Sequence, residues 1–382
     1  MRLGANYVPS TGWFYGWLDF DPDATRRDLA DLAGIGLDHV RVFPIWPWVQ
    51  PNRGLVRLRA VDDLLTLIDI AAEFDLGVAV DLLQGHLSSF DFLPSWVLTW
   101  HQRSLFTDAT ARAGVADYAA RLSAAVASRS NVFAITLGNE VNNLWPSNAT
   151  TPDASHTWAR DLIDVVRAAA PHVLALHSVY DDAWYAPDHP FHPTDAVTIG
   201  DLTTVHSWVF NGVSRLDGPL GPATTSHADY LVSLAASTAP DRAVWLQEVG
   251  APRPDIPEEH AEEFVRTTLD TVAPNPALWG VTWWCSHDID RALLDFPARE
   301  YDLGLFTVDH QPKPAARALA AFARSQPTPV TAPALECPVD LLSEPHRRAE
   351  VAPGSPFHTE WVRRRQAGPV GIVSGERVSR AG

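Results

Sequence analysis

Residues 132–143 decide how the chain is interpreted, and they read Val132-Phe133-Ala134-Ile135-Thr136-Leu137-Gly138-Asn139-Glu140-Val141-Asn142-Asn143. The run from Val132 to Thr136 is apolar or β-branched, which is typical of a strand buried on both faces. It stops at Gly138, and an amide, Asn139, and a carboxylate, Glu140, follow directly. Burying an unpaired charge is costly, so a carboxylate at the end of such a strand indicates a functional site rather than part of the core.

Strand-like runs of this kind recur along the chain and alternate with helical patterns. We predict eight strands, at residues 3–9, 39–43, 77–83, 132–138, 173–180, 202–208, 243–247 and 280–285. Strands that alternate with helices predict a parallel sheet built from βα units. Eight units fit an α/β fold of the (β/α)8 TIM-barrel type better than a doubly wound sheet, which more often has five or six strands.

The helices between these strands are predicted from start and stop signals and from periodicity. Asp21-Pro22 opens the first helix, which ends near Gly34 or Gly36. Further helices are predicted at residues 61–75, 108–128, 153–170 and 226–237, from residue 257 onward, and at residues 314–324. The connection after the fifth strand is rich in Pro and His and has little helical signal, so this unit is the weakest of the eight.

The composition changes after about residue 325. Residues 1–325 are predicted to form the catalytic barrel, whereas residues 326–382 are rich in Pro, Arg and Gly with brief apolar runs. This tail either packs on the barrel or is partly disordered, and periodicity does not decide between the two.

The overall charge limits the classes of partner. The chain has 29 Lys and Arg against 46 Asp and Glu, a formal net charge of −17. An acidic surface disfavours nucleic acid and anionic membranes and suits a neutral small molecule. No apolar segment approaches the roughly 18 residues needed to cross a bilayer, and the N-terminus has no secretory signal, so a cytoplasmic location is expected. The oligomeric state is left open.

Tryptophan is unusually frequent, at 15 residues. Core packing explains any one of them. Many, however, lie at or just after strand-like runs, which as a group predicts a stacking surface for flat apolar ligand faces. They are Trp13, Trp17, Trp46, Trp48, Trp96, Trp100, Trp145, Trp208 and Trp284.

The active site of a barrel lies at the C-terminal ends of its strands. Those ends offer two carboxylates, Glu140 after the fourth strand and Glu248 after the seventh. Either one alone is equally well explained as a structural ion pair, but both follow apolar strands beside an amide, Asn139 or Gln247. Two carboxylates on either side of a glycosidic bond are what glycoside hydrolysis requires. The other polar or aromatic strand-end residues are Arg41, His86, His206 and Trp284.

These residues resemble clan A of the glycoside hydrolases, and within it family 5. The likeness rests on Asn139-Glu140 after strand four, on Glu248 after strand seven, and on Arg41 on strand two. His86, His206 and Trp284 fall where that family keeps residues that line the site. The sequence Asp302-Leu303-Gly304-Leu305-Phe306 resembles the family's last βα unit. The likeness covers residues 3–323.

The resemblance implies a retaining mechanism. Glu140 would be the acid/base and Glu248 the nucleophile, with carboxyl groups about 5–5.5 Å apart. Asn139 would hydrogen-bond the sugar 2-hydroxyl, and Arg41 would keep Glu248 ionised. A less polar environment should raise the pKa of Glu140. Trp284 would be the platform beneath the sugar.

The sequence departs from the family at one position. The family usually has a Tyr two residues after its strand-six His, and its hydroxyl steadies the nucleophile. Here the sequence is His206-Ser207-Trp208. Trp208 is one candidate for that role through its indole N–H, and Tyr7 or Tyr180 are the others. The sequence does not choose among them.

The opening Gly4-Ala5-Asn6-Tyr7-Val8, together with Trp96 and Trp283-Trp284-Cys285, resembles the β-mannosidase branch of the family. A small oligosaccharide is therefore the expected partner, and an exo-acting β-mannosidase is the preferred function. An endo-β-1,4-mannanase or endo-β-glucanase is the alternative, and a non-catalytic carbohydrate-binding barrel the second. No cofactor and no metal are expected, because metal-ligand, phosphate-loop and dinucleotide motifs are all missing from the sequence.

Overall fold

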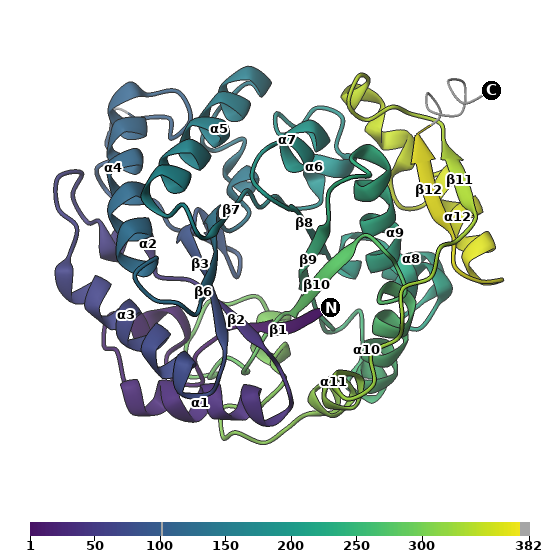
Figure 1. Ribbon diagram of the computed structural model, residues 1–382, viewed down its shortest axis with the longest axis horizontal. Coiled ribbons are helices and arrows are strands. Elements are labelled where there is room, and N and C mark those ends of the chain that lie inside the picture. Colours follow the sequence, from purple (N-terminus) through teal and green to yellow (C-terminus); the bar gives the residue numbers. More distant parts are fainter. Residues whose placement is uncertain (101, 375–382) are drawn as a thin grey trace.

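The computed structural model describes residues 1–100 and 102–374. Eight parallel strands form a nearly closed barrel, and helices surround it (Figure 1). The TIM-barrel prediction is confirmed. In sequence order the strands of the barrel are β1 (Arg2–Asn6), β2 (His39–Val42), β3 (Gly77–Leu83), β6 (Val132–Gly138), β7 (Leu174–Leu176), β8 (Thr203–Ser207), β9 (Val244–Val249) and β10 (Leu278–Trp283). The short hairpin β4 (His86–Leu87) and β5 (Phe90–Asp91) follows β3.

Between β7 and β8 the barrel is held together by individual hydrogen bonds and not by a regular strand ladder. The ladder runs in the order β7-β6-β3-β2-β1-β10-β9-β8, so these two strands are its edges. Asp201 N donates to Ala175 O at 2.9 Å, and the Thr204 hydroxyl donates to His177 O at 2.8 Å. Strand β7 is therefore shorter than the predicted 173–180, because beyond Leu176 the chain has a regular ladder on neither side.

Most helices begin where the sequence signals them. The Asp21 side chain accepts from Asp23 N and Ala24 N at the start of α1, and Asp108 accepts from Ala111 N at the start of α4. After β7 only short helices form, in agreement with the weak signal there. The helices are α1 (Pro22–Gly34), α2 (Trp46–Val49), α3 (Leu58–Glu73), α4 (Ala109–Val126), α5 (Pro152–Ala169), α6 (Asp182–Tyr185), α7 (Pro193–Thr198), α8 (Ser214–Asp217), α9 (Pro222–Thr238), α10 (Glu258–Val272), α11 (Pro314–Ala323) and α12 (Pro356–Arg365). No helix of the described chain is long and apolar enough to cross a membrane.

The barrel interior has an apolar layer below a polar one. Trp245 packs in one cluster with Ala79, Ala134 and Leu176, which come from strands that are not its neighbours in the sheet, so these side chains face inward. Above them the side chains are polar and linked to one another: Gln247 Nε2, for example, donates to Thr136 Oγ1 at 3.2 Å. Their hydrogen bonds offset the cost of burying these polar side chains inside the barrel.

The prediction that the strand-end tryptophans form a stacking surface is wrong for three of the nine. Trp13, Trp46 and Trp96 are buried and pack against other aromatic rings. The loops after the strands are long enough to build their own apolar core, and large aromatic side chains fill it. Three of the nine, Trp145, Trp208 and Trp284, line the cavity described below.

The described part of the tail, residues 326–374, is folded and packs on α9. It contains β11 (Ala334–Cys337), α12 and β12 (Gly371–Ser374), and the two strands pair in parallel (Figure 1). Helix α9 is apolar or weakly polar around most of its circumference and is buried along almost its whole length. A helix with this composition needs cover on more than one face, and the tail supplies it. Trp361 packs on Tyr230 with ring centroids 5.1 Å apart. Residues 375–382 lie outside the described chain.

Arg348 anchors the tail to the loop between α6 and α7. Its buried guanidinium donates to four backbone carbonyls, those of Ala186, Pro187, His189 and Phe191. Removing the donor leaves buried carbonyl groups unpaired, so Arg348→Ala is expected to lower the free energy of unfolding by about 2–4 kcal/mol. Urea denaturation measures the change. The neighbouring Arg347 forms ion pairs with Glu344 and Glu350 at the surface, so Arg347→Ala should lower the free energy of unfolding much less. Equal losses in the two variants would contradict the anchoring role.

Candidate active site

The candidate active site lies at the C-terminal ends of the barrel strands. A cavity of about 570 Å³ opens there, and Glu140 and Glu248 both reach into it. The cavity receives residues from the long loops after β3, β7 and β10 as well as from the strand ends. It is lined by His86, Ser88, Ser89, Asn139, Glu140, Asn143, Trp145, Pro146, Tyr180, Asp182, His189, Trp208, Phe210, Glu248, Trp284, Pro297, Arg299 and Glu300.

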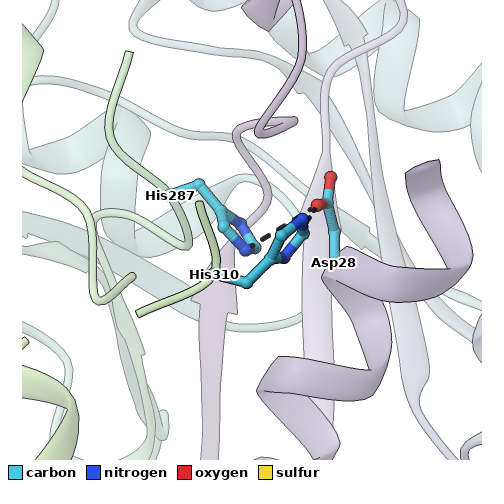
Figure 2. Close-up of side chains that lie close together, drawn as sticks. All are labelled: Asp28, His287 and His310. Carbon is cyan, nitrogen blue, oxygen red and sulfur yellow. Dashed lines mark ion pairs between the residues drawn. The ribbon is translucent and has the colours of Figure 1, made fainter. Parts of the chain in front are cut away.

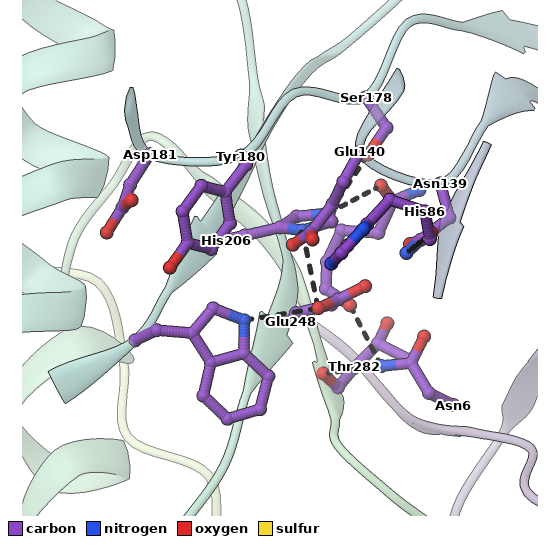
Figure 3. Close-up of polar contacts among 12 residues, drawn as sticks. Asn6, His86, Asn139, Glu140, Ser178, Tyr180, Asp181, His206, Glu248 and Thr282 are labelled. Carbon is purple, nitrogen blue, oxygen red and sulfur yellow. Dashed lines mark hydrogen bonds and ion pairs between the residues drawn. The ribbon is translucent and has the colours of Figure 1, made fainter. Parts of the chain in front are cut away.

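Glu140 follows β6 in a backbone conformation that few residues adopt. Its φ is 45° and its ψ is 43°, in the left-handed region. The bend turns the chain from the strand into a short 3-10 helix, Val141–Leu144. Glu140 Oε2 accepts from Asn143 Nδ2 at 3.0 Å within that turn, and Oε1 lies 2.7 Å from His206 Nδ1. The turn and the histidine therefore fix the carboxyl group at the cavity wall (Figure 3).

Glu248 lies within β9 and is supported from below by Arg41. Arg41 Nη1 donates to Glu248 Oε1 at 2.7 Å. The same guanidinium is held by a bidentate pair with Asp81, at 2.9 and 2.6 Å, and also donates to Asn6 Oδ1 at 3.1 Å. All of these side chains are buried. Asp81 therefore compensates the charge of Arg41 and holds the guanidinium in place.

Trp208 supplies the donor that the sequence left unassigned. Its indole Nε1 donates to Glu248 Oε2 at 3.2 Å. Tyr7 lies elsewhere and donates to Asp28 Oδ2 at 2.8 Å. Tyr180 lines the cavity, but its hydroxyl is engaged by Asn211 at 2.5 Å. Of the three candidates, only Trp208 has a hydrogen bond to Glu248 in the described chain.

His206 joins the two carboxyl groups from beneath. Its Nδ1 lies 2.7 Å from Glu140 Oε1 and 3.3 Å from Glu248 Oε2. Its Nε2 faces Ser178 Oγ at 2.9 Å and Gln247 Oε1 at 3.2 Å. Burial lowers the pKa of His206, so the ring is neutral at neutral pH.

Burial raises the pKa of Glu140 to about 7 and that of Glu248 to about 7. The charges that act on them differ. Glu248 accepts from a guanidinium and an indole, whereas Glu140 accepts from an amide and faces a neutral imidazole. The two groups interact and titrate as a pair, and the site that receives the stronger donors is the one that ionises first. The stronger donors on Glu248 therefore favour ionisation of Glu248 before Glu140.

The remaining predicted residues surround this pair. Asn139 Oδ1 accepts from Arg41 Nη2 at 2.7 Å and its Nδ2 donates to His86 O at 2.8 Å, which leaves one amide hydrogen for a ligand. The ring of His86 pairs with Asp91 at 2.8 Å, and although burial alone lowers its pKa, Asp91 and nearby carboxylates raise it overall. Trp284 lies on the cavity wall against Trp208. Arg41 and His206 lie beneath the cavity instead of lining it.

Several residues of this site were not predicted from the sequence as site residues. Asp81 had a signal, since it is a lone carboxylate within the apolar run of the third strand. Glu300 had none, because it lies in a polar segment far from any strand end. Its carboxyl group faces the cavity, and burial raises its pKa to about 7. Tyr180, which the sequence offered only as a candidate donor to Glu248, also lines the cavity, and its own burial raises its pKa strongly.

Glu140, His206 and Glu248 also have the donor types of a metal site. One ligand atom from each lies within 4.8 Å of the others. Each of those atoms already has a hydrogen-bond or ion-pair partner, and Arg41 places a positive charge beside the site. The arrangement is therefore suited to proton transfer and covalent chemistry at carbon rather than to holding a cation.

Comparisons with known proteins were made on the sequence and on the fold. No protein-family model matches the chain, and no curated protein is similar to it. A GH5_18 enzyme from Streptomyces cattleya is 48% identical, with 100% of this chain and 95% of that chain covered and a TM-score of 0.95; it was solved as a Glu-to-Ala variant in complex with Manβ1-4GlcNAc.

Two more solved structures extend the comparison. A GH5_18 variant from Bifidobacterium longum subsp. longum, also in complex with Manβ1-4GlcNAc, is 38% identical, with 99% of this chain and 92% of that chain covered and a TM-score of 0.94. The exo-β-1,4-mannosidase Op5Man5 from Opitutaceae bacterium strain TAV5 is 25% identical, with 98% and 69% covered and a TM-score of 0.81.

Proposed function

The chain belongs to glycoside hydrolase family 5 and is a glycosidase, and from this premise we propose that it is a retaining, exo-acting β-mannosidase for short β-linked oligosaccharides such as Manβ1-4GlcNAc. The observation that carries the proposal is the similarity, over the whole chain, to enzymes crystallised with that disaccharide. The similarity to an exo-β-1,4-mannosidase supports the exo assignment.

The spacing of the two carboxyl groups supports retention of configuration. An oxygen of Glu140 lies within 4.8 Å of an oxygen of Glu248. Retaining enzymes hold their carboxyl groups about 5–5.5 Å apart, whereas inverting enzymes leave about 6.5–9.5 Å for a water molecule. The spacing of these oxygens is closer to the first range than to the second.

In the proposed reaction Glu248 attacks the anomeric carbon while Glu140 gives its proton to the leaving oxygen. The bond from the anomeric carbon to the aglycone breaks, and a mannosyl ester of Glu248 forms. Glu140, now ionised, then takes a proton from water, which displaces Glu248 and releases mannose.

The size of the cavity supports a short substrate. A volume of about 570 Å³ is that of a small-molecule pocket rather than of an open groove for a polymer. Glu300 and Arg299 from the loop after β10, and His189 from the loop after β7, stand in its wall. Loops in these places would close one end of a cleft, as exo action requires.

The test is hydrolysis of Manβ1-4GlcNAc beside p-nitrophenyl β-mannoside and p-nitrophenyl β-glucoside. We expect mannose from the disaccharide and preference for the mannoside of the two aryl substrates. A longer β-1,4-mannan oligosaccharide should yield mannose alone at the earliest times. Mannobiose or longer first products would favour an endo-β-mannanase, preference for the glucoside a β-glucanase, and no release from any substrate a binding protein.

The pH dependence follows from the carboxyl pair. Glu248 must be ionised, so kcat/KM falls as the pH drops through the lower apparent pKa of the pair. Glu140 must be protonated, so kcat/KM also falls as the pH rises through the upper one. Because burial raises both pKa values to about 7, we expect a narrow bell-shaped profile near pH 7. Initial rates at low substrate from about pH 4 to 9 measure it. A plateau extending below about pH 5 would mean that Glu248 has an ordinary pKa.

Replacing Trp208 tests the unusual donor to Glu248. Trp208→Phe removes the N–H that stabilises the ionised carboxylate, so the pKa of Glu248 should rise and the acidic limb of the pH profile should move to higher pH. A decrease in kcat/KM of about 10-fold is expected. Trp208→Tyr, which carries a hydroxyl as relatives in the family do, should recover part of the loss. An acidic limb that stays in place in Trp208→Phe would contradict the role.

A further inference from the structure

A second cluster of ionisable side chains lies outside the active-site cavity. It consists of Asp28 and Asp31 from α1, His287 from the segment after β10, and His310 from the turn before α11. Figure 2 shows both imidazole rings directed at the Asp28 carboxylate. None of the four lines the cavity that holds Glu140 and Glu248.

The four ligand atoms enclose a small space. His287 Nε2 lies 3.7 Å from Asp28 Oδ1 and 3.3 Å from Asp31 Oδ2. His310 Nδ1 lies 3.9 and 2.7 Å from the same two oxygens. Ligands about 2.0–2.1 Å from a tetrahedral zinc ion are about 3.3–3.4 Å from one another. Three of the four separations lie within roughly 0.6 Å of that value. One ligand atom each from Asp28, His287 and His310 lies within 4.8 Å of the others. Asp31 Oδ2 joins this group through hydrogen bonds to both imidazoles.

Hydrogen bonding within the cluster leaves one carboxylate oxygen unsatisfied. Asp28 is buried, and its Oδ2 accepts from the Tyr7 hydroxyl at 2.8 Å and from Ser10 N at 3.1 Å. Its Oδ1 has no hydrogen-bond partner among the described residues, although both imidazoles face it. A buried carboxylate oxygen without a donor is costly. A cation between the four groups would remove that cost.

The backbone holds the two histidines in place. His287 pairs with Phe306 in a β-bridge, and the two rings stack with centroids 5.5 Å apart. His310 follows in a turn closed by hydrogen bonds of Thr307 with Gln311 and with His310 itself. His287 is fully buried, whereas the side chains of His310 and Asp31 are 29% and 24% exposed. The outer two side chains therefore leave a path by which an ion can enter.

We propose that Asp28, Asp31, His287 and His310 bind one divalent transition-metal ion of the zinc type, which joins the first helix of the barrel to the segments that follow its last strand. Two carboxylates and two imidazoles are ligands that Zn²⁺ accepts in tetrahedral sites. The negative charges of the two carboxylates balance the two positive charges of the ion. Since the cluster connects the first and the last βα units, the ion should stabilise barrel closure and leave catalysis unchanged.

The test uses the full-length enzyme, stripped with EDTA and dialysed. Titration with ZnSO₄ by calorimetry is expected to give one equivalent of bound ion. The midpoint of thermal denaturation should rise by about 2–4 °C at saturating Zn²⁺. Co²⁺ used in place of Zn²⁺ should show the visible absorption of tetrahedral coordination, which a loosely held surface ion lacks.

Substitutions inside and outside the cluster test whether the ion binds there. His310→Ala and Asp31→Asn should each lose the bound equivalent and the thermal shift, and neither removes the Asp28 contacts that support Tyr7 and Ser10. His346→Ala, at an exposed histidine, and Glu140→Gln should both retain them. No binding by the unsubstituted enzyme, or an ion that persists in both cluster variants, would overturn the proposal. Loss in Glu140→Gln alone would assign the ion to the catalytic carboxyl groups and overturn it equally.

Discussion

Replacing Glu248 by alanine is expected to lower kcat/KM for p-nitrophenyl β-mannoside by about 10⁴-fold or more, because the proposed mechanism forms the glycosyl ester on its carboxylate. In the proposed mechanism Glu248 is the ionised carboxyl group, which the hydrogen bonds from Arg41 at 2.7 Å and from Trp208 at 3.2 Å favour. Without it the glycosyl ester cannot form. Initial-rate kinetics at matched enzyme concentration measure the loss.

The control for this variant is its folding. Arg41 keeps its bidentate pair with Asp81 when Glu248 is removed, so its charge stays compensated and the barrel should remain folded. Circular dichroism and thermal denaturation check this point. Glu259→Ala, at an exposed glutamate on α10, should retain full activity. The nucleophile role has a separate test: NMR of the first anomer released by the unsubstituted enzyme should show retained configuration, and an inverted product would exclude a covalent intermediate on Glu248.

Replacing Glu140 by alanine is expected to lower kcat/KM by an amount that depends on the leaving group of the substrate. For Manβ1-4GlcNAc the leaving alkoxide needs a proton, so kcat/KM should fall by about 10³-fold or more. For 2,4-dinitrophenyl β-mannoside the leaving phenolate needs none, and kcat/KM, which reports formation of the glycosyl-enzyme, should fall by less than about 10-fold. The basic limb of the pH profile should disappear with the dinitrophenyl substrate, because Glu140 is the group whose deprotonation causes it.

The second step of the reaction gives an independent check. Without Glu140 no base activates water, so the glycosyl-enzyme should accumulate and appear as a burst of dinitrophenol. Azide, which needs no base, should restore turnover by displacing Glu248. If the two substrates lose activity equally and azide has no effect, Glu140 is not the acid/base, and Glu300, the other cavity carboxyl group with a pKa of about 7, would be the next residue to test.

The barrel was predictable because its signals are local. Apolar runs predict strands, and residues such as Asp21 and Asp108 mark helix starts through hydrogen bonds within the first turn. The strand-end rule needs no tertiary information either, since in any barrel of parallel strands those ends share one face. It selected Glu140, Glu248, Asn139 and Trp284, which surround one cavity.

The features that were predicted wrongly or left open depend on contacts between distant segments of the chain. The tryptophans in loops were predicted to face a ligand, yet Trp13, Trp46 and Trp96 are buried, because only the packing of one loop on another decides which ring meets solvent. The fold of the tail depends likewise on α9, which ends at Thr238 and which the tail covers. Neither the burial of these tryptophans nor the fold of the tail has a local signal in the sequence.

The sequence alone therefore determined the order of the eight barrel strands, the main helices between them and the pair of glutamates, because hydrophobic periodicity and the direction of parallel strands suffice for them. The tertiary structure decided which group completes the nucleophile's environment, and it selected Trp208, since a donor is identified by its distance to Glu248 and not by its position in the chain. It also brought Asp28 and Asp31 to His287 and His310 across the closure of the barrel. Residues so far apart in sequence meet only when the last βα unit packs on the first.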